Sequence, residues 1–331
     1  MKLLVAPLTV SIVVLAAVFF WGGSGALFIA FALAVLEVTL SFDNAVINAR
    51  VLEKMSARWQ RRFLTWGVLV SVGIVRFVLP VLIVSTIVAL SPIQIAALAF
   101  AEPAKYAALV ATAEPAIKAF GGTFLLLVSL RYFFNKEKEV HWIATIERRL
   151  ARWGEVEAIG IAFALIALFM VATLSSAPHA LILESGLIGT VLFIAMESIT
   201  RALGVEARAA ARSSFALFVY LDVLDTAFSL DSVVGAFAIT TSVPVIVAGL
   251  GIGAFFVRSL TLMLVRGGTL KKLLYIEHGA YWAIFALALC MFGALIVPIP
   301  EWFVASVGLL LVLFAYLSSR RVLAYEPEVI R

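Results

Sequence analysis

The sequence predicts an all-α, polytopic transmembrane bundle of about ten spans, and three observations favour that fold class. Hydrophobic residues make up 64% of the 331 and charged residues only 14%, whereas a soluble domain is about 45–50% apolar and about 25% charged. Mean hydropathy is +1.12. Apolar runs of about 18 or more residues recur, each long enough to cross roughly 30 Å of hydrocarbon. The roughly ten-residue alternating segments of a transmembrane β-barrel do not occur.

Charge and cysteine content exclude several classes of function. The net charge of +5 does not point to nucleic acid, because the basic residues lie in short loops, where they set membrane orientation. Cys290 is the single cysteine, which excludes an intramolecular disulfide and a thiolate metal site. The three histidines are scattered and lack metal-ligand spacing.

The first two apolar runs are predicted to be separate spans. The run 2–20 could be a signal peptide, but a glycine-rich segment, 22–25, leads directly into a second run, which favours a retained helix. The second span, 26–49, is followed by a basic loop, and a third is predicted at 63–90.

The next stretch, 91–118, is only mildly apolar and is interrupted by Glu102-Pro103 and Glu114-Pro115. We expect it not to cross the membrane and to form a non-cytoplasmic or re-entrant segment. A fourth span is predicted at 119–134. In the polar stretch 135–154, apolar residues recur at helical spacing, which predicts an amphipathic helix on the membrane surface.

The second half contains six predicted spans: 158–174, 180–200, 213–240, 243–265, 280–297 and 302–319. We divide the chain into an N-terminal helix (1–25), a first repeat (26–134), an amphipathic cytoplasmic linker with two inserted spans (135–212) and a second, inverted repeat (213–331). With both termini in the cytoplasm, every basic loop falls on one face. The expected location is a prokaryotic cytoplasmic membrane.

Two related polar motifs lie within the apolar spans. Residues 37–46 read EVTLSFDNAV and residues 225–234 read DTAFSLDSVV. The ungapped alignment pairs Glu37 with Asp225, Ser41 with Ser229, Asp43 with Asp231, and Asn44 with Ser232. A charged side chain in a bilayer costs at least about 2.5 kcal/mol, so such residues are rare and usually functional.

The predicted orientation makes the two motif helices antiparallel. The helix after each motif carries an arginine, Arg76 in the first half and Arg258 in the second. This arrangement is typical of an inverted-topology repeat, in which the substrate site lies at the repeat interface near the bilayer midplane.

Helical geometry leaves two interpretations of the motifs open. Glu37, Ser41 and Asn44 share one helix face, as do their counterparts in the second motif, whereas Asp43 and Asp231 fall off that face. Either the helices are broken near Ser41 and Ser229, so that all these residues meet one ligand, or the two off-face aspartates pair with Arg76 and Arg258.

The donor set is all oxygen, which suits a hard divalent cation. The expected metal ligands are Glu37, Asp43, Asn44, Asp225, Asp231 and Ser232, with Ser41, Ser229 and Asp222 in support. Arg76 and Arg258 would balance charge, although structural pairing is the alternative for both. The carboxylates could also take up protons when the metal leaves, which is the basis of cation/proton antiport.

Three further features have structural interpretations. Glu197 is expected to pair with Arg201, four residues on. The glycines at 121–122 and at 249, 251 and 253 are expected to allow close helix packing. Glu277-His278 is expected to mark the start of a helix rather than a ligand pair.

In these motifs the chain resembles the TerC family of integral membrane proteins, within the LysE transporter superfamily. The segments Gly121-Gly122-Thr123-Phe124-Leu125-Leu126 and His141-Trp142-Ile143…Ile146-Glu147 further resemble a branch known mainly as a domain of unknown function. The resemblance runs from about residue 26 to the C-terminus. It implies a metal-ion exporter with Mn²⁺ as the leading substrate, and an association with tellurium resistance. The extra N-terminal span and the two inserted spans depart from the shorter members.

The favoured function is therefore export of a divalent cation by alternating access, with no prosthetic group and with cation and membrane lipid as partners. The direction of transport rests on the resemblance alone. One alternative is export of an amino acid or other small solute, as in LysE relatives. Another is a non-transporting scaffold that helps to metalate or assemble partner proteins. An enzyme is the least favoured class, because no His–Glu zinc motif or Ser–Lys nucleophile pair is apparent.

Overall fold

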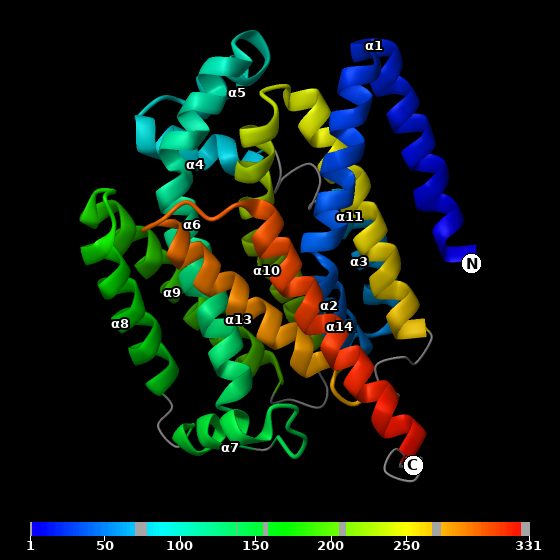
Figure 1. Cartoon of the computed structure of the whole chain (residues 1–331), viewed down its shortest axis with the longest axis vertical. Coiled ribbons are helices and arrows are strands. Elements are labelled where there is room, and N and C mark those ends of the chain that lie inside the picture. The colour runs from blue at the N-terminus through cyan, green and yellow to red at the C-terminus, as the bar shows by residue number, and fades with distance from the viewer. Residues whose placement is uncertain are drawn as a thin grey trace.

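A computed structural model describes residues 2–69, 78–136, 138–154, 158–204, 210–266 and 273–325. Within these ranges the chain forms α-helices and no strand, which confirms the all-α prediction. Figure 1 shows the helices gathered into one bundle, with α7 lying across one end.

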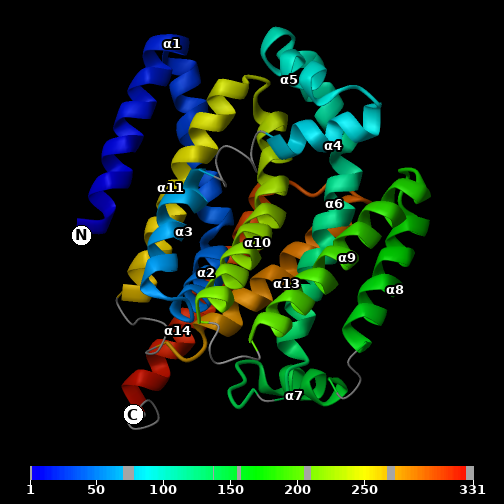
Figure 2. The same cartoon turned by 180° about the vertical axis from the view of Figure 1, so that it is seen from behind.

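The first helix, α1 (Lys2–Leu40), has two arms. At Gly23 the backbone takes φ 75° and ψ −169°, a conformation that is essentially restricted to glycine. Figures 1 and 2 both show the chain reversing there, so that the arms lie side by side. The two arms correspond to the first predicted span and to most of the second.

The second predicted span, 26–49, is not one straight helix. The helix α1 ends at Leu40 and α2 spans Phe42–Glu53, so the chain is broken at Ser41, inside the first motif. The next helices are α3 (Ala57–Leu69), α4 (Leu79–Val88) and α5 (Pro92–Ala101). The last two meet at an angle of 114°, the bend of a broken span or of a re-entrant segment.

The central helix, α6, spans Pro103–Phe133, and here the sequence prediction was wrong. The fourth span was expected to begin at 119, but the helix begins sixteen residues earlier and continues through Pro115. Proline at the first helical position costs no hydrogen bond, and neighbouring helices allow a proline inside a membrane helix. Burial explains why the helix is continuous, since 83% of the residues in the most apolar part of α6 are buried.

The remaining helices follow the predicted order. They are α7 (Ala144–Trp153), α8 (Ile159–Leu174), α9 (His179–Gly204), α10 (Ala210–Ile239), α11 (Val243–Arg266), α13 (Ile276–Ala294) and α14 (Glu301–Tyr325).

Six of the described helices are long and apolar enough to cross a membrane, or seven if the bent pair α4–α5 is one span. The prediction of about ten differs for physical reasons. The two arms of α1 are counted once although a kink at Gly23 separates them, α8 is 16 residues long, and α10 carries Asp222, Asp225 and Asp231. The third predicted span crosses residues 70–77, which lie outside the described ranges.

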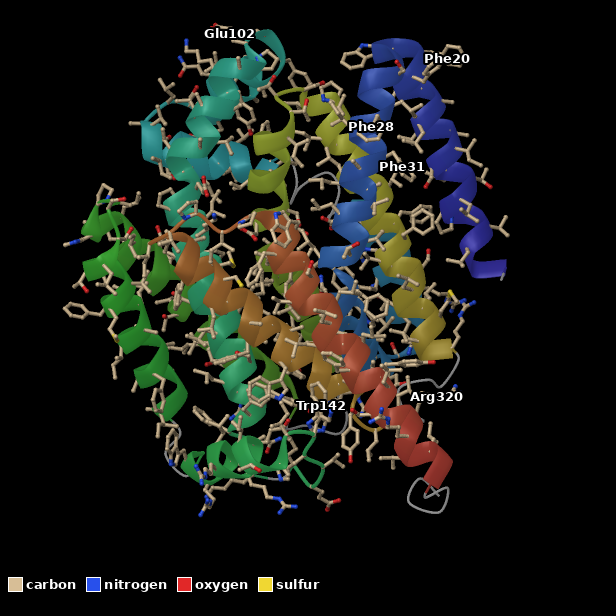
Figure 3. The ribbon with its side chains drawn as sticks, in the orientation of Figure 1. Phe20, Phe28, Phe31, Glu102, Trp142 and Arg320 are labelled. Carbon is tan, nitrogen blue, oxygen red and sulfur yellow. The ribbon has the colours of Figure 1, made fainter. Side chains whose placement is uncertain are left out.

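Large apolar side chains cover the outside of the bundle. Phe20 is 86% exposed, Phe28 72% and Trp302 68%. In Figure 3, Phe20, Phe28 and Phe31 follow the two arms of α1, Glu102 lies at the same end as their turn, and Arg320 and Trp142 lie toward the other end. Apolar flanks between two polar ends, on several long helices, make the chain an integral membrane protein.

The two motif helices run in opposite directions, as predicted. In Figures 1 and 2 the second arm of α1 and then α2 descend, whereas α10 rises toward the end at which α11 begins. Each motif helix also contacts the helix that follows the other motif, since α11 packs on α2 and α3 packs on α10. This reciprocal packing brings the two motifs together.

Candidate functional site

The break at Ser41 is a kink rather than an unwound segment. The N–H of Ser41 still donates to the carbonyl of Glu37 (2.9 Å), and the N–H of Ala45 donates to the carbonyl of Ser41 (3.1 Å). The hydroxyl of Ser41 donates to Glu37 Oε1 at 3.0 Å. In the second motif α10 continues through Ser229, so a break occurs at the first of the two predicted positions only.

A direct hydrogen bond joins the two motifs. Asn44 Nδ2 donates to Asp225 Oδ1 at 2.9 Å, and these side chains belong to residues that are 1% and 8% exposed. Residues 181 positions apart in the chain are therefore neighbours, so the first and second motifs touch at this point.

Arg258, the arginine after the second motif, pairs with two aspartates of α10. Arg258 Nη2 lies 3.5 Å from Asp225 Oδ2 and 3.9 Å from Asp222 Oδ1. Arg258 Nη1 donates to the carbonyl of Phe63 at 2.7 Å, and the guanidinium lies 4.3 Å from the centre of that ring.

Arg258 thus pairs with a motif carboxylate, Asp225, rather than with Asp231 as one of the two interpretations held. Asp231 lies six residues beyond Asp225, about 9 Å along the helix at 1.5 Å per residue and on another face. Arg76, the counterpart of Arg258 in the first half, lies outside the described residues. The corresponding pairing of Arg76 with Asp43 therefore stays open.

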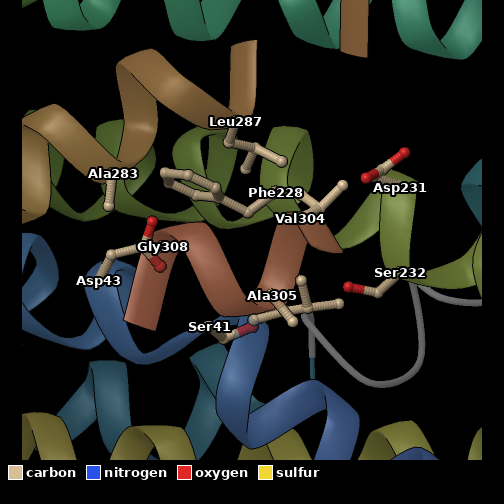
Figure 4. A pocket seen from close by; sticks show the side chains of 11 residues that line it. Ser41, Asp43, Phe228, Asp231, Ser232, Ala283, Leu287, Val304, Ala305 and Gly308 are labelled. Atoms are coloured by element: carbon tan, nitrogen blue, oxygen red, sulfur yellow. The ribbon is translucent and has the colours of Figure 1, made fainter. Parts of the chain in front are cut away.

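Asp43 and Asp231 instead line a small cavity, together with Ser41 and Ser232 (Figure 4). The cavity has a volume of about 20 Å³, which is room for roughly one water molecule. The two carboxylates lie toward opposite ends of it. Helices α13 and α14 close the remaining sides through apolar or small residues: Ala283, Leu287, Val304, Ala305 and Gly308.

Glycines let α11 approach the first motif closely. A Cβ at Gly253 would lie 2.5 Å from Cβ and Cγ of Glu37, and one at Gly249 would lie 2.7 Å from the carbonyl of Ala30. The packing role expected for these two glycines is confirmed. Close approach also explains how Glu37, in the middle of the helix pair, is only 1% exposed.

Two buried polar features of the site escaped the sequence prediction. Asn48 is 2% exposed, and its Oδ1 accepts no hydrogen bond from the described part of the chain; its place four residues after Asn44 is a signal that could have identified it. Lys118 is 8% exposed, and its Nζ lies 2.6 Å from Glu114 Oε1. These two residues are the charges that act on Asp231, although they lie in the stretch expected not to cross the membrane.

The predicted ligands therefore fall into separate small groups. Glu37 bonds Ser41, Asp225 bonds Asn44 and Arg258, and Asp43 and Asp231 face the cavity. In the ranges that the structure describes, no three His, Cys, Asp or Glu residues are arranged to hold a metal ion. Coordination by all the predicted ligands at once would require the motif helices to move relative to one another.

Away from this site, a buried carboxylate ties α7 to α13. Glu147 is 0% exposed. Its carboxylate lies 2.7 Å from Lys138 Nζ and 3.0 Å from His278 Nδ1, and it accepts hydrogen bonds from Trp282 Nε1 (3.0 Å) and from the N–H of Ile143 (3.3 Å). We call Glu147, Lys138, His278 and Trp282 the Glu147 clasp.

These contacts shift the pKa of Glu147 and of Lys138. Burial alone would raise the pKa of Glu147, but hydrogen bonds from His278, Lys138 and Trp282 outweigh it and hold that pKa well below its usual range. Burial lowers the pKa of Lys138, and its hydrogen bond to Glu147 opposes that effect. The predicted amphipathic helix is thus anchored to the bundle through an acidic residue.

Two smaller predictions have mixed outcomes. Glu197 pairs with Arg131 of α6 at 2.6 Å, a contact between helices, whereas the side chain of Arg201, its expected partner, lies outside the described part of the structure. Glu277-His278 does lie in the first turn of α13, as predicted. Both side chains also make specific contacts, Glu277 with Arg50 and His278 with Glu147.

Comparison with known proteins gives one family. The family of proteins of unknown function DUF475 matches residues 42–323, a range that holds the whole second motif and residues 42–46 of the first. Comparison with curated proteins and with solved structures gives no match. The resemblance to an uncharacterised-domain branch agrees with this result, whereas the likeness to the TerC family stays an expectation. Because the match covers most of its length, the chain belongs to the DUF475 family of proteins of unknown function.

Proposed function

We propose that the chain is a secondary transporter that exports a small divalent cation, with Mn²⁺ as the favoured substrate. The observation that carries the proposal is the Asn44–Asp225 hydrogen bond of 2.9 Å, because it joins two antiparallel acidic motifs around one cavity. Such a meeting of inverted helices is the architecture in which transporters bind substrate near the midplane.

The charge of the site favours a cation. Four motif carboxylates are buried: Glu37, Asp43, Asp225 and Asp231. Two arginines, Arg258 and its counterpart Arg76, could neutralise two of them at most. The remaining negative charge is costly in a membrane interior unless a cation or protons compensate it. Exchange of the metal for protons at the same carboxylates would therefore couple export to proton uptake.

The size of the cavity separates this proposal from export of an organic solute. At about 20 Å³, the cavity is far below the roughly 300–1,000 Å³ that is usual for small-molecule sites. A dehydrated cation fits such a space, whereas an amino acid does not fit this conformation. The polar side chains of the lining, two carboxylates and two hydroxyls, offer only oxygen donors, which are the ligands that hard divalent cations prefer.

The kink at Ser41 supplies the element that alternating access requires. Asp43 lies two residues beyond it, and Glu37 lies four residues before it. A change in the kink angle would move Asp43 relative to Asp231 across the cavity, while the second motif stays on the continuous helix α10. We infer that this motion brings the separated carboxylates onto one ion.

The test is Mn²⁺ flux into proteoliposomes that contain a metal-sensitive and a pH-sensitive dye. We expect flux with opposite proton movement in the wild type and at least a tenfold loss in Asp43→Asn and in Asp231→Asn. Glu184→Gln is the matched control, because Glu184 is an exposed carboxylate of α9 that lies outside the motifs. Flux that survives both aspartate substitutions would overturn the site, and a folded wild type that moves no ion would favour the scaffold alternative.

A further inference from the structure

A second, larger cavity lies at the far end of the first motif helix. It has a volume of about 680 Å³ and is lined by Arg50, Glu53, Lys54, Gln60, Val265, Arg266 and Glu277. We call it the vestibule. All of its lining residues except Val265 are polar or charged, and three of them, Arg50, Glu53 and Lys54, lie at the C-terminal end of α2.

The vestibule and the small cavity are close but share no lining residue. Arg50 follows Asp43 by seven positions along α2, which is about 10 Å at 1.5 Å per residue. Every residue from Asp43 to Ala49 is buried. A solute in the vestibule is therefore about two helical turns from the carboxylate of Asp43 and is blocked by packed side chains.

One ion pair crosses from α2 to α13 at the wall of the vestibule. Arg50 Nε lies 2.5 Å from Glu277 Oε2, and Arg50 Nη1 lies 3.6 Å from Glu53 Oε2. The Arg50 and Glu277 side chains are 37% and 24% exposed. Ion pairs that water reaches in this way stabilise a fold only slightly, so this pair can break without unfolding the chain.

The first turn of α13, which contains Glu277, is also held by the Glu147 clasp. His278, the residue after Glu277, bonds Glu147 at 3.0 Å. Farther along α13, Ala283 and Leu287 line the small cavity. The position of the first turn of α13 therefore links the vestibule to the wall of the substrate cavity.

We propose that the Arg50–Glu277 ion pair is the gate between the vestibule and the substrate cavity. With the pair intact, α13 is held against α2 and the path is closed. The guanidinium of Arg50 pairs with the carboxylates of Glu277 and Glu53, which an incoming cation would meet first. A cation that binds these two carboxylates displaces the guanidinium and opens the path. The identity of the displacing cation rests on the proposed function, whereas the gate itself does not.

Access to the small cavity tests the gate without any transported substrate. In a Cys290→Ala background, Ala305→Cys places one thiol in the cavity wall. A small cationic methanethiosulfonate is added from the side of the membrane that the vestibule faces. We expect Arg50→Gln and Glu277→Gln to raise the labelling rate roughly two- to fivefold, the shift that loss of a water-accessible ion pair supports.

Two further variants make the test specific. The exchange Arg50→Glu with Glu277→Arg restores the pair in reverse and should return labelling to the starting rate. Arg131→Gln removes an ion pair of similar length between α6 and α9 and should leave labelling unchanged. Unchanged labelling in both neutral variants, or an equal rise in Arg131→Gln, would overturn the gate. Loss of Mn²⁺ flux with the expected labelling pattern would remove the proposed substrate and leave the gate standing.

Discussion

Replacement of Glu147 tests how firmly α7 is fastened to the bundle. Glu147→Ala removes a fully buried carboxylate and leaves Lys138, whose side chain is 8% exposed, without its partner. Breaking a buried ion pair from one side costs about 3–5 kcal/mol. For a chain of this size that corresponds to a fall in Tm of roughly 6–10 °C.

The assay is thermal unfolding of the purified protein in detergent, followed by tryptophan fluorescence and by loss of the monodisperse elution peak. Glu139→Ala is the matched control, because Glu139 is an exposed carboxylate of the same segment and its replacement should stay within about 0.5 kcal/mol of the wild type. Replacing both charges, by Glu147→Leu with Lys138→Met, should recover part of the loss. A Tm for Glu147→Ala that equals the Tm of the control would refute the clasp.

The pH dependence of the clasp has a definite sign. The pKa of Glu147 in the folded protein is depressed, so its contribution is fully present above the ordinary glutamate pKa of about 4.3 and is lost only as the pH falls through the folded value. Stability should therefore not decline on account of this carboxyl between about pH 7 and pH 5. A loss over that range in the wild type that Glu147→Gln abolishes would contradict this assignment.

Two other predictions concern the helices around the motifs. Gly253→Leu forces α11 away from Glu37 and should cost about 1–3 kcal/mol by overpacking, whereas a Cβ at Gly25 meets nothing within 4 Å and Gly25→Ala should be well tolerated; equal thermal stability of the two would argue against the close approach. Asn44→Ala and Asp225→Ala should be non-additive, with an interaction energy of about 1 kcal/mol in a double-mutant cycle of unfolding. Additive losses would mean that the two motifs do not touch.

Hydropathy and charge placement were sufficient to predict the broad architecture. Apolar length identifies spans, and the positive-inside rule orients them, so the antiparallel course of the two motif helices could be inferred without a structure. Local proline and glutamate signals were misleading at Pro103 and Pro115, because burial of α6 by its neighbours outweighs the local preference of a sequence for a turn. A span is predicted from composition, whereas the length of α6 is determined by its packing against neighbouring helices.

The arrangement of side chains around the motifs was harder to predict. The partners of Arg258 depend on which face of α10 it meets, and a helical wheel does not give the relative rotation of two helices. A kink at Ser41 without one at Ser229 likewise follows from surroundings that the aligned motifs do not encode. Glu147 lies in a polar stretch that reads as a solvated surface helix, and only contacts from α13, about 130 residues away, reveal it as buried.

We propose that both motifs contribute to one cation site in each chain. The most direct measurement is Mn²⁺ binding to the purified protein, followed by the loss of the free-ion signal in electron paramagnetic resonance. We expect one site for each chain in the wild type and no site in either Asp43→Asn or Asp231→Asn, with Glu184→Gln unchanged. Two sites in the wild type, with each aspartate substitution removing one of them, would contradict a shared site.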